Sequence, residues 1–221
     1  MRIARINDIK PLVSGHVDDD RAQMLPESSR ALWSLWQRDS AGTGTGVPHA
    51  GSIDPLRLWP WLGYLIVADQ VHGRYRYRVF GSEIAVNAGF DLSGTWMDES
   101  LDWETIQLFC QQYESVSAAR QVLHAEHIRI GAGLRISRLV LPYSRTGDAV
   151  DTFIVHYVWS RMPRTEVDVA LGRARGQALP GQTKVFLWRP SAPVCRTGKA
   201  KLMRTNPRRI RPLRQALRLP T

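Results

Sequence analysis

The sequence predicts an α+β fold, in which an antiparallel sheet of five strands carries helices on one face. Two strand-like runs precede a group of helix-like segments, and three strand-like runs joined by short glycine-containing turns follow it. No regular alternation of strand and helix is visible, which argues against a doubly wound nucleotide-binding fold. The 221 residues, 43% of them hydrophobic, are enough to bury a core.

An amphipathic helix is predicted over residues 26–40, after a flexible segment at residues 1–25. Ser28 or Ser29 can cap its first turn. Its apolar side chains recur at helical spacing, and we expect them to contact a protein partner or a second copy of the chain. These interaction candidates are Leu32, Trp33, Leu35 and Trp36. The glycine-rich loop that follows, up to residue 47, lacks the lysine of phosphate-binding loops.

A β-hairpin is predicted next, with strands at residues 64–68 and 74–80 and a turn at 69–73. Asp54 followed by Pro55 is typical of a helix start, so a short helix should lead into the first strand. The hairpin begins the sheet.

The second strand of this hairpin alternates aromatic residues with arginines. Because a strand projects successive side chains to opposite faces, the alternation predicts one packed face and one solvated face. The alternative is an RNA-recognition strand that stacks bases on Tyr75 and Tyr77, but the signature of such strands is only partly met. The structural interpretation turns Tyr75, Tyr77 and Val79 to one face and Arg74, Arg76 and Arg78 to the other.

Two helices and three strands complete the prediction. The first helix runs from Ser82 to about Ala88 and ends at Gly89, and a longer helix covers residues 102–120. The three strands are placed at residues 121–128, 133–144 and 149–160.

Four short motifs follow one another between residues 48 and 160. They are Asp54-Pro55, Tyr77-Arg78 with Gly81-Ser82, the segment from Gly89 to Gly94 with Asp91 and Leu92, and Leu141-Pro142-Tyr143. In this order they resemble a PAS-like domain family of alphaproteobacteria, single-PAS proteins of largely undefined function. The resemblance implies a PAS-like domain over residues 48–160 with a sensory or regulatory role. Ser82 and Tyr143 depart mildly from the family's threonine and leucine.

PAS relatives often hold a small molecule between the sheet and the helices, so the resemblance implies a mostly apolar ligand site there. The identity of a ligand or cofactor stays unknown at this point. The candidate lining residues are Tyr77, Val79, Ile84, Phe109, Ile154 and His156.

Metal and catalytic signatures are weak. His124 and His127 lie three apart in a predicted strand and should point to opposite faces, so we interpret them as structural residues rather than haem ligands. Cys110 lies outside the motif of PAS flavin photoreceptors, and two cysteines are too few for a disulfide scaffold or a thiolate zinc site. With no known catalytic motif in the sequence, we expect a protein that is not an enzyme.

Basic charge is concentrated at the C-terminal end. Residues 1–160 hold 15 Lys and Arg against 18 Asp and Glu, whereas residues 161–221 hold 15 against 2. The latter segment is predicted to be a basic tail rich in proline and arginine. Three interpretations stay open for it: a nucleic-acid-binding arm, an interfacial membrane anchor, or a solvated extension. The nucleic-acid candidates are Arg204, Arg208, Arg209, Arg211 and Arg214.

The sequence shows no candidate for a transmembrane helix. The most clearly apolar segment, residues 58–68, contains Pro60 and Gly63 and is shorter than the roughly 20 residues that a spanning helix needs. The N-terminal residues lack a secretory signal pattern. We therefore expect a cytoplasmic sensory or regulatory module, with nucleic-acid association through the tail as the alternative.

Overall fold

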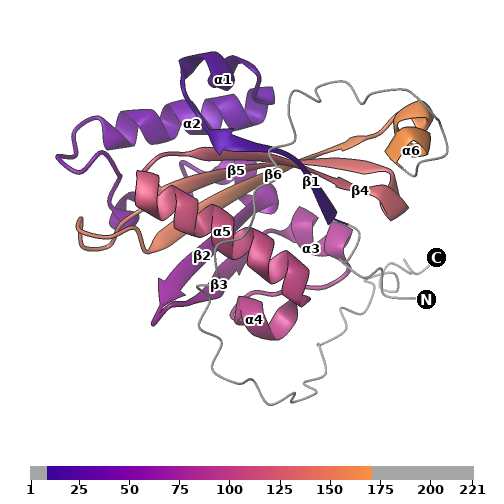
Figure 1. Ribbon diagram of the computed structural model, residues 1–221. Helices are drawn as coiled ribbons and strands as arrows, with labels where there is room; N and C mark the ends of the chain where they lie inside the picture. The colour runs from indigo at the N-terminus through magenta and orange to yellow at the C-terminus, as the bar shows by residue number, and fades with distance from the viewer. Residues whose placement is uncertain (1–8, 171–221) are drawn as a thin grey trace, which may run out of the picture.

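The computed structural model describes residues 9–170, which form one six-stranded antiparallel sheet with helices against both faces (Figure 1). The strands are β1 (Ile9–His16), β2 (Leu65–Val71), β3 (Arg74–Phe80), β4 (Leu123–Arg129), β5 (Leu134–Tyr143) and β6 (Thr152–Arg161). Their order across the sheet is β1-β4-β5-β6-β2-β3. The α+β class is confirmed.

The helices divide between the two faces of the sheet. They are α1 (Asp19–Gln23), α2 (Glu27–Ser40), α3 (Ser82–Ala88), α4 (Met97–Ser100), α5 (Trp103–Ala119) and α6 (Arg164–Ala170), with 3-10 turns η2 (Ala50–Ser52), η3 (Trp59–Tyr64) and η4 (Ile130–Ala132). Helices α1 and α2 cover one face, and α3, α4 and α5 lie below the other (Figure 1). The prediction of helices on one face only is wrong, because the amphipathic helix at residues 26–40 packs on the opposite face from α3–α5.

Each face has its own apolar core. The α2 core joins Leu32, Trp33 and Trp36 to sheet residues such as Leu139 and Ile154. The α5 core joins the other face of the same strands to α3, α4 and α5. Alternate residues of β5 and β6 therefore serve different cores, as the two-residue period of a strand requires.

The prediction of five strands missed β1. This strand pairs with β4 from Ile9 opposite Arg129 to His16 opposite Leu123, with an irregularity after Pro11. Proline cannot donate to a ladder and is tolerated on an edge strand, which is where β1 lies. The expectation of a flexible segment at residues 1–25 is wrong for residues 9–25, where β1 and α1 form and Leu25 is buried.

Helix α2 occupies the predicted span, but the predicted cap is wrong. Pro26 is the N-cap residue, and both serines lie inside the first turn. The Ser29 hydroxyl is buried and lies 3.0 Å from Nδ1 of His156 on β6. It therefore connects the helix to the sheet rather than capping it.

The hairpin is confirmed, with a longer first strand and a tighter turn than predicted. Strand β2 continues to Val71, and His72 and Gly73 make the turn with φ angles of 51° and 77°. Positive φ at both central residues matches the right-handed twist of a hairpin. Helix α3 ends at Gly89, as predicted, with a φ of 84°.

A β-bulge changes which residues of β3 are buried. Val67 of β2 pairs with Val79, but the next residue, Ala68, pairs with Tyr77, so Arg78 is the extra residue. Tyr75 and Tyr77 are buried as predicted. Beyond the bulge the alternation is reversed, so that Val79 is exposed and Phe80 is buried.

The folded region extends into the segment predicted to be a tail. Met162 is buried, α6 follows it, and Glu166 of α6 accepts a hydrogen bond of 3.0 Å from Arg135. The predicted boundary at residue 161 is therefore wrong by about ten residues. Residues 171–221 and the five arginines predicted to bind nucleic acid lie outside the described residues.

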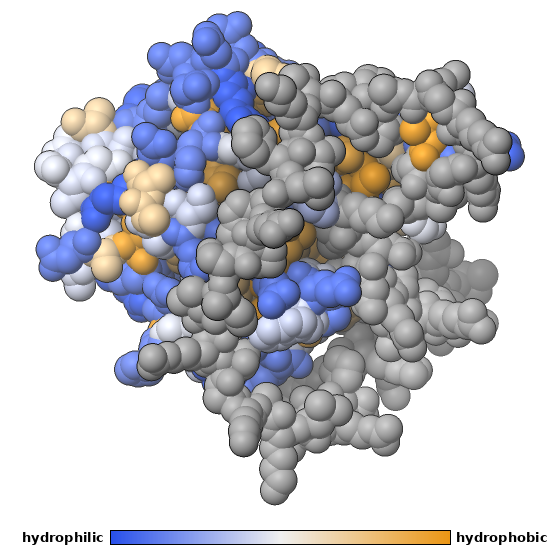
Figure 2. Space-filling model, in the orientation of Figure 1, coloured by the Kyte–Doolittle hydropathy of each residue, from blue (hydrophilic) through white to orange (hydrophobic). Residues whose placement is uncertain are grey.

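The part of the surface that Figure 2 colours is mainly hydrophilic, with a few hydrophobic residues among the hydrophilic ones. None of the described helices is long and apolar enough to cross a membrane.

Candidate ligand site

A cavity of about 90 Å³ lies between the sheet and helices α3 and α5. Residues from the five strands β2 to β6 form one wall, and the segment from α3 to α5 forms the other. Its lining is almost entirely apolar and rich in aromatic rings, with a few polar groups. The lining residues are Ile66, Tyr77, Phe80, Ile84, Asn87, Ala88, Phe90, Leu92, Leu101, Thr105, Phe109, Arg129, Leu134, Ile136, Tyr157 and Trp159.

Three of the six predicted lining residues meet at this cavity. Tyr77 comes from β3, Ile84 from α3 and Phe109 from α5, and all three are buried. Elements that are well separated in the sequence thus bring these side chains together. Whether they contact a ligand stays a prediction.

Val79 does not line the cavity, because the bulge at Arg78 reverses the alternation. Val79 is 38% exposed, and Phe80 takes the inward position with its ring centre 5.6 Å from that of Tyr77. The sequence-based assignment assumed an unbroken period of two. Phe80 is the residue that it missed.

Ile154 and His156 lie on the wrong face of β6 to reach the cavity. Ile154 packs in the α2 core, and His156 contacts Ser29 of α2. Tyr157, adjacent to His156, lines the cavity together with Trp159. Because β6 is buried on both faces, its residues are apolar on both sides. The sequence therefore does not indicate which alternate residues of β6 face the cavity.

A buried polar cluster adjoins the inner side of the cavity. Arg138 of β5 is 1% exposed, and its Nη1 donates to the side-chain oxygen of Gln112 on α5. Its guanidinium carbon lies 3.6 Å from the ring centre of Phe109 and 5.2 Å from that of Tyr157. Nothing in the local sequence of β5 predicted a buried arginine.

Three of the sheet histidines, His124, His127 and His156, have buried side chains that are hydrogen-bonded. Nε2 of His124 lies 2.9 Å from Ser137 Oγ, and Nε2 of His127 lies 3.2 Å from Gln112 Nε2. Burial lowers the pKa of His124, and lowers that of His127 to about 3 and that of His156 to about 4. Within residues 9–170, no group of three or more His, Cys, Asp or Glu side chains is placed to hold a metal ion.

The predicted interaction face of α2 is occupied by the sheet. Leu32, Trp33 and Trp36 are buried, and Leu35 is partly buried against the same core. The Trp36 indole donates a 2.8 Å hydrogen bond to the Pro142 carbonyl of β5. These four candidates for contact with a partner therefore pack within the chain.

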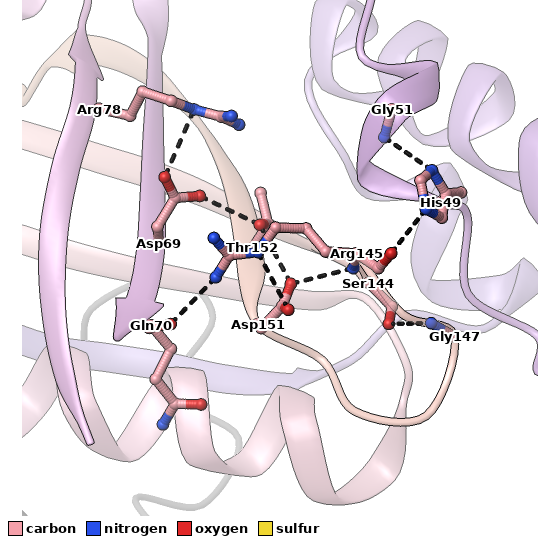
Figure 3. A network of polar contacts seen from close by, with 10 residues as sticks. All are labelled: His49, Gly51, Asp69, Gln70, Arg78, Ser144, Arg145, Gly147, Asp151 and Thr152. Carbon is pink, nitrogen blue, oxygen red and sulfur yellow. Dashed lines mark hydrogen bonds and ion pairs between the residues drawn. The ribbon is translucent and has the colours of Figure 1, made fainter. Parts of the chain in front are cut away.

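A second polar network lies near the β5–β6 turn (Figure 3). Arg145 donates to Asp151 through its backbone N–H and Nε, both at 3.1 Å, and through Nη2 to the Gln70 carbonyl. His49 lies 2.7 Å from the Arg145 carbonyl, and Thr152 donates to Asp69. Since the polar groups drawn engage one another, we interpret this network as a structural link between the hairpins and the loop before η2.

Comparison with protein-family models, with curated proteins and with solved structures finds no significant match. The resemblance of residues 48–160 to PAS-like domains therefore stays a prediction.

Proposed function

We propose that the chain is a non-enzymatic sensory or regulatory module that binds a small molecule in the cavity between its sheet and helices α3 and α5. The composition of the cavity wall carries the proposal. Apolar and aromatic side chains make up most of it, with Asn87, Thr105 and Arg129 among the few polar groups. Small-molecule sites typically have this composition.

The arrangement of the chain adds support. Three helices are inserted after the β2–β3 hairpin, and β4, β5 and β6 follow as neighbours in one antiparallel sheet. This order of elements agrees with the two strands, helices and three strands predicted from the sequence within residues 48–160, the range of the PAS-like resemblance. Strand β1 and helix α1 are additions to it.

Strand β6 offers a route from the cavity to α2. Tyr157 lines the cavity, and the adjacent His156 contacts Ser29 of α2 through the opposite face of the sheet. A ligand that favours one position of β6 would thereby favour one packing of α2, because it shifts the equilibrium toward the state that it binds better.

The burial of the Ser29–His156 pair supports the proposal that the chain is not an enzyme. It combines a hydroxyl and an imidazole, but the two residues are 0% and 2% exposed. A substrate could not reach the hydroxyl without displacing α2 from the sheet.

A cavity-filling variant tests this proposal. We expect Ile84→Trp to abolish retention of a small molecule by the purified full chain, as measured by native mass spectrometry, because the indole fills part of the cavity. Overpacking costs about 1–3 kcal/mol, so Ala88→Leu serves as a milder second variant. The matched control is Val86→Trp, on the same helix at a side chain that is 75% exposed. Equal retention by all three variants would place the ligand elsewhere.

The alternative function is nucleic-acid association through the C-terminal segment. Residues 171–221 contain 13 Lys and Arg and no Asp or Glu. We expect the full chain to bind a DNA or RNA oligonucleotide with an affinity that falls steeply with salt, because phosphate contacts release counterions. A chain ending at Ala170 should lose this binding. Equal binding by both chains would exclude the segment as the binding site.

A further inference from the structure

Arg138 is a buried cation without a carboxylate partner among residues 9–170. Its side chain is the largest of the fully buried ones in this part of the chain, and none of the described ion pairs includes it. Nη1 bonds Gln112, but Nε and Nη2 have no hydrogen-bond partner. Buried arginine is normally paired, because removing its charge from water is costly.

A further unpartnered donor lies beside this guanidinium. The Gln112 side-chain oxygen accepts from Arg138, so the amide nitrogen is left to donate to Nε2 of His127. Because burial and the Arg138 charge keep His127 neutral, its proton lies on Nδ1, and this atom also has no partner. The cluster therefore offers three unused donors and favours an acceptor that carries negative charge.

The neighbouring phenols supply no negatively charged acceptor. Burial raises the pKa of Tyr113 and of Tyr157, and Arg138 opposes this rise through its charge and through side-chain hydrogen bonding, so both neutral hydroxyls lie close to the guanidinium. Neither hydroxyl meets the geometry of a hydrogen bond with Nε or Nη2, and a neutral phenol is a weaker acceptor than a carboxylate.

Two aromatic rings contact the guanidinium and also line the cavity. The ring centre of Phe109 lies 3.6 Å from the guanidinium carbon, and that of Tyr157 lies 5.2 Å from it. The contact of a cation with an aromatic face is weaker than the pair of hydrogen bonds that a guanidinium makes with a carboxylate. A ligand anion could therefore displace Phe109 favourably.

We infer that the cavity takes a small monocarboxylate with an apolar body, whose carboxylate displaces the Phe109 ring and binds Arg138. The apolar wall around Ile84 and Trp159 would cover the rest of the molecule. This inference rests on the proposed function and names the chemical class of its ligand.

Matched acids and amides test the inference. The probes are phenylacetate and hexanoate, each compared with its uncharged amide, titrated into the full chain by calorimetry at pH 7.5. We expect each acid to bind at least about tenfold more tightly than its amide, and Arg138→Met to remove this difference. Arg138→Lys should retain part of it, because lysine keeps the charge but not the planar fork.

Arg38→Met is the control, since Arg38 is exposed on α2, across the sheet from the cavity. It should leave the preference for the acid unchanged. Arg129→Met tests the arginine of the cavity wall as the alternative anion site. The melting temperature of Arg138→Met without probe should equal or exceed that of the wild type, because a buried charge without an ion partner does not favour folding.

Several results would overturn the inference. One is loss of the preference in Arg129→Met but not in Arg138→Met, which would move the anion to the cavity's partly exposed side. Unfolding of Arg138→Met would show that the arginine has a structural role. Absence of probe binding would also overturn the inference. Equal binding of acid and amide, abolished by Ile84→Trp, would refute the anion site while leaving the cavity as a ligand site.

Discussion

Buried histidines are the side chains through which pH should act on this fold. Burial lowers the pKa of His156 from 6.5 to about 4 and that of His127 from 6.5 to about 3. In the unfolded chain both would titrate near 6.5, so between that value and their folded pKa the unfolded state binds more protons. The stability that they contribute is complete above pH 6.5 and is lost as the pH falls toward 4.

We therefore expect the free energy of unfolding to decrease by about 2 kcal/mol per histidine between pH 7 and pH 5. Denaturant unfolding at several pH values measures this. His156→Gln keeps a polar side chain near Ser29 but cannot be protonated. It should therefore reduce the change in the free energy of unfolding with pH. An equal slope in wild type and variant would show that His156 does not contribute.

Single residues also show where sequence-based prediction reached its limit. Tyr77, Ile84 and Phe109 were identified as cavity residues because their elements and inward faces could be read from the sequence. Val79 was misassigned because one inserted residue, Arg78, reverses the alternation. A bulge is set by pairing with a distant strand and has no reliable local signature here.

At the scale of elements, α2 packs its apolar face on the sheet of its own chain. Its spacing of leucine and tryptophan predicted an apolar face correctly, but that pattern does not say what covers the face. The sheet covers it, as the burial of Leu32 and Trp33 shows. Strand β1 was missed for a related reason: an edge strand containing proline has too little alternation to stand out.

The attachment of α2 to β5 gives a prediction at this scale. Trp36→Phe should lower the free energy of unfolding by about 1–3 kcal/mol, because it leaves the buried Pro142 carbonyl without its donor and removes packed atoms. The control is Trp59→Phe, whose side chain is 74% exposed and should have little effect. Denaturant unfolding measures both variants. An equal decrease in the free energy of unfolding for Trp36→Phe and Trp59→Phe would argue against a specific role for the indole hydrogen bond.

At the scale of the whole molecule, the sheet lies between the cavity and helix α2. One face holds the cavity under α3 and α5, and the other holds α2. Strands β5 and β6 belong to both cores, with Arg138 and Tyr157 on the cavity side and Leu139 and His156 on the α2 side. This shared sheet is the physical link by which an event in the cavity would be felt at α2.

The sequence could predict the class of fold and most strand positions, since these depend on local patterning. It could not place helices on both faces or find the Arg138 cluster, because both depend on which distant segments meet. The basic segment beyond residue 170 was identified from composition alone.

Native mass spectrometry of the full-length protein, purified from its own host under non-denaturing conditions, is the first test of whether the cavity holds a small molecule. The proposal predicts a defined non-covalent adduct of constant mass that is lost on denaturation. A protein that carries only its own mass, under conditions that preserve its fold, would contradict it.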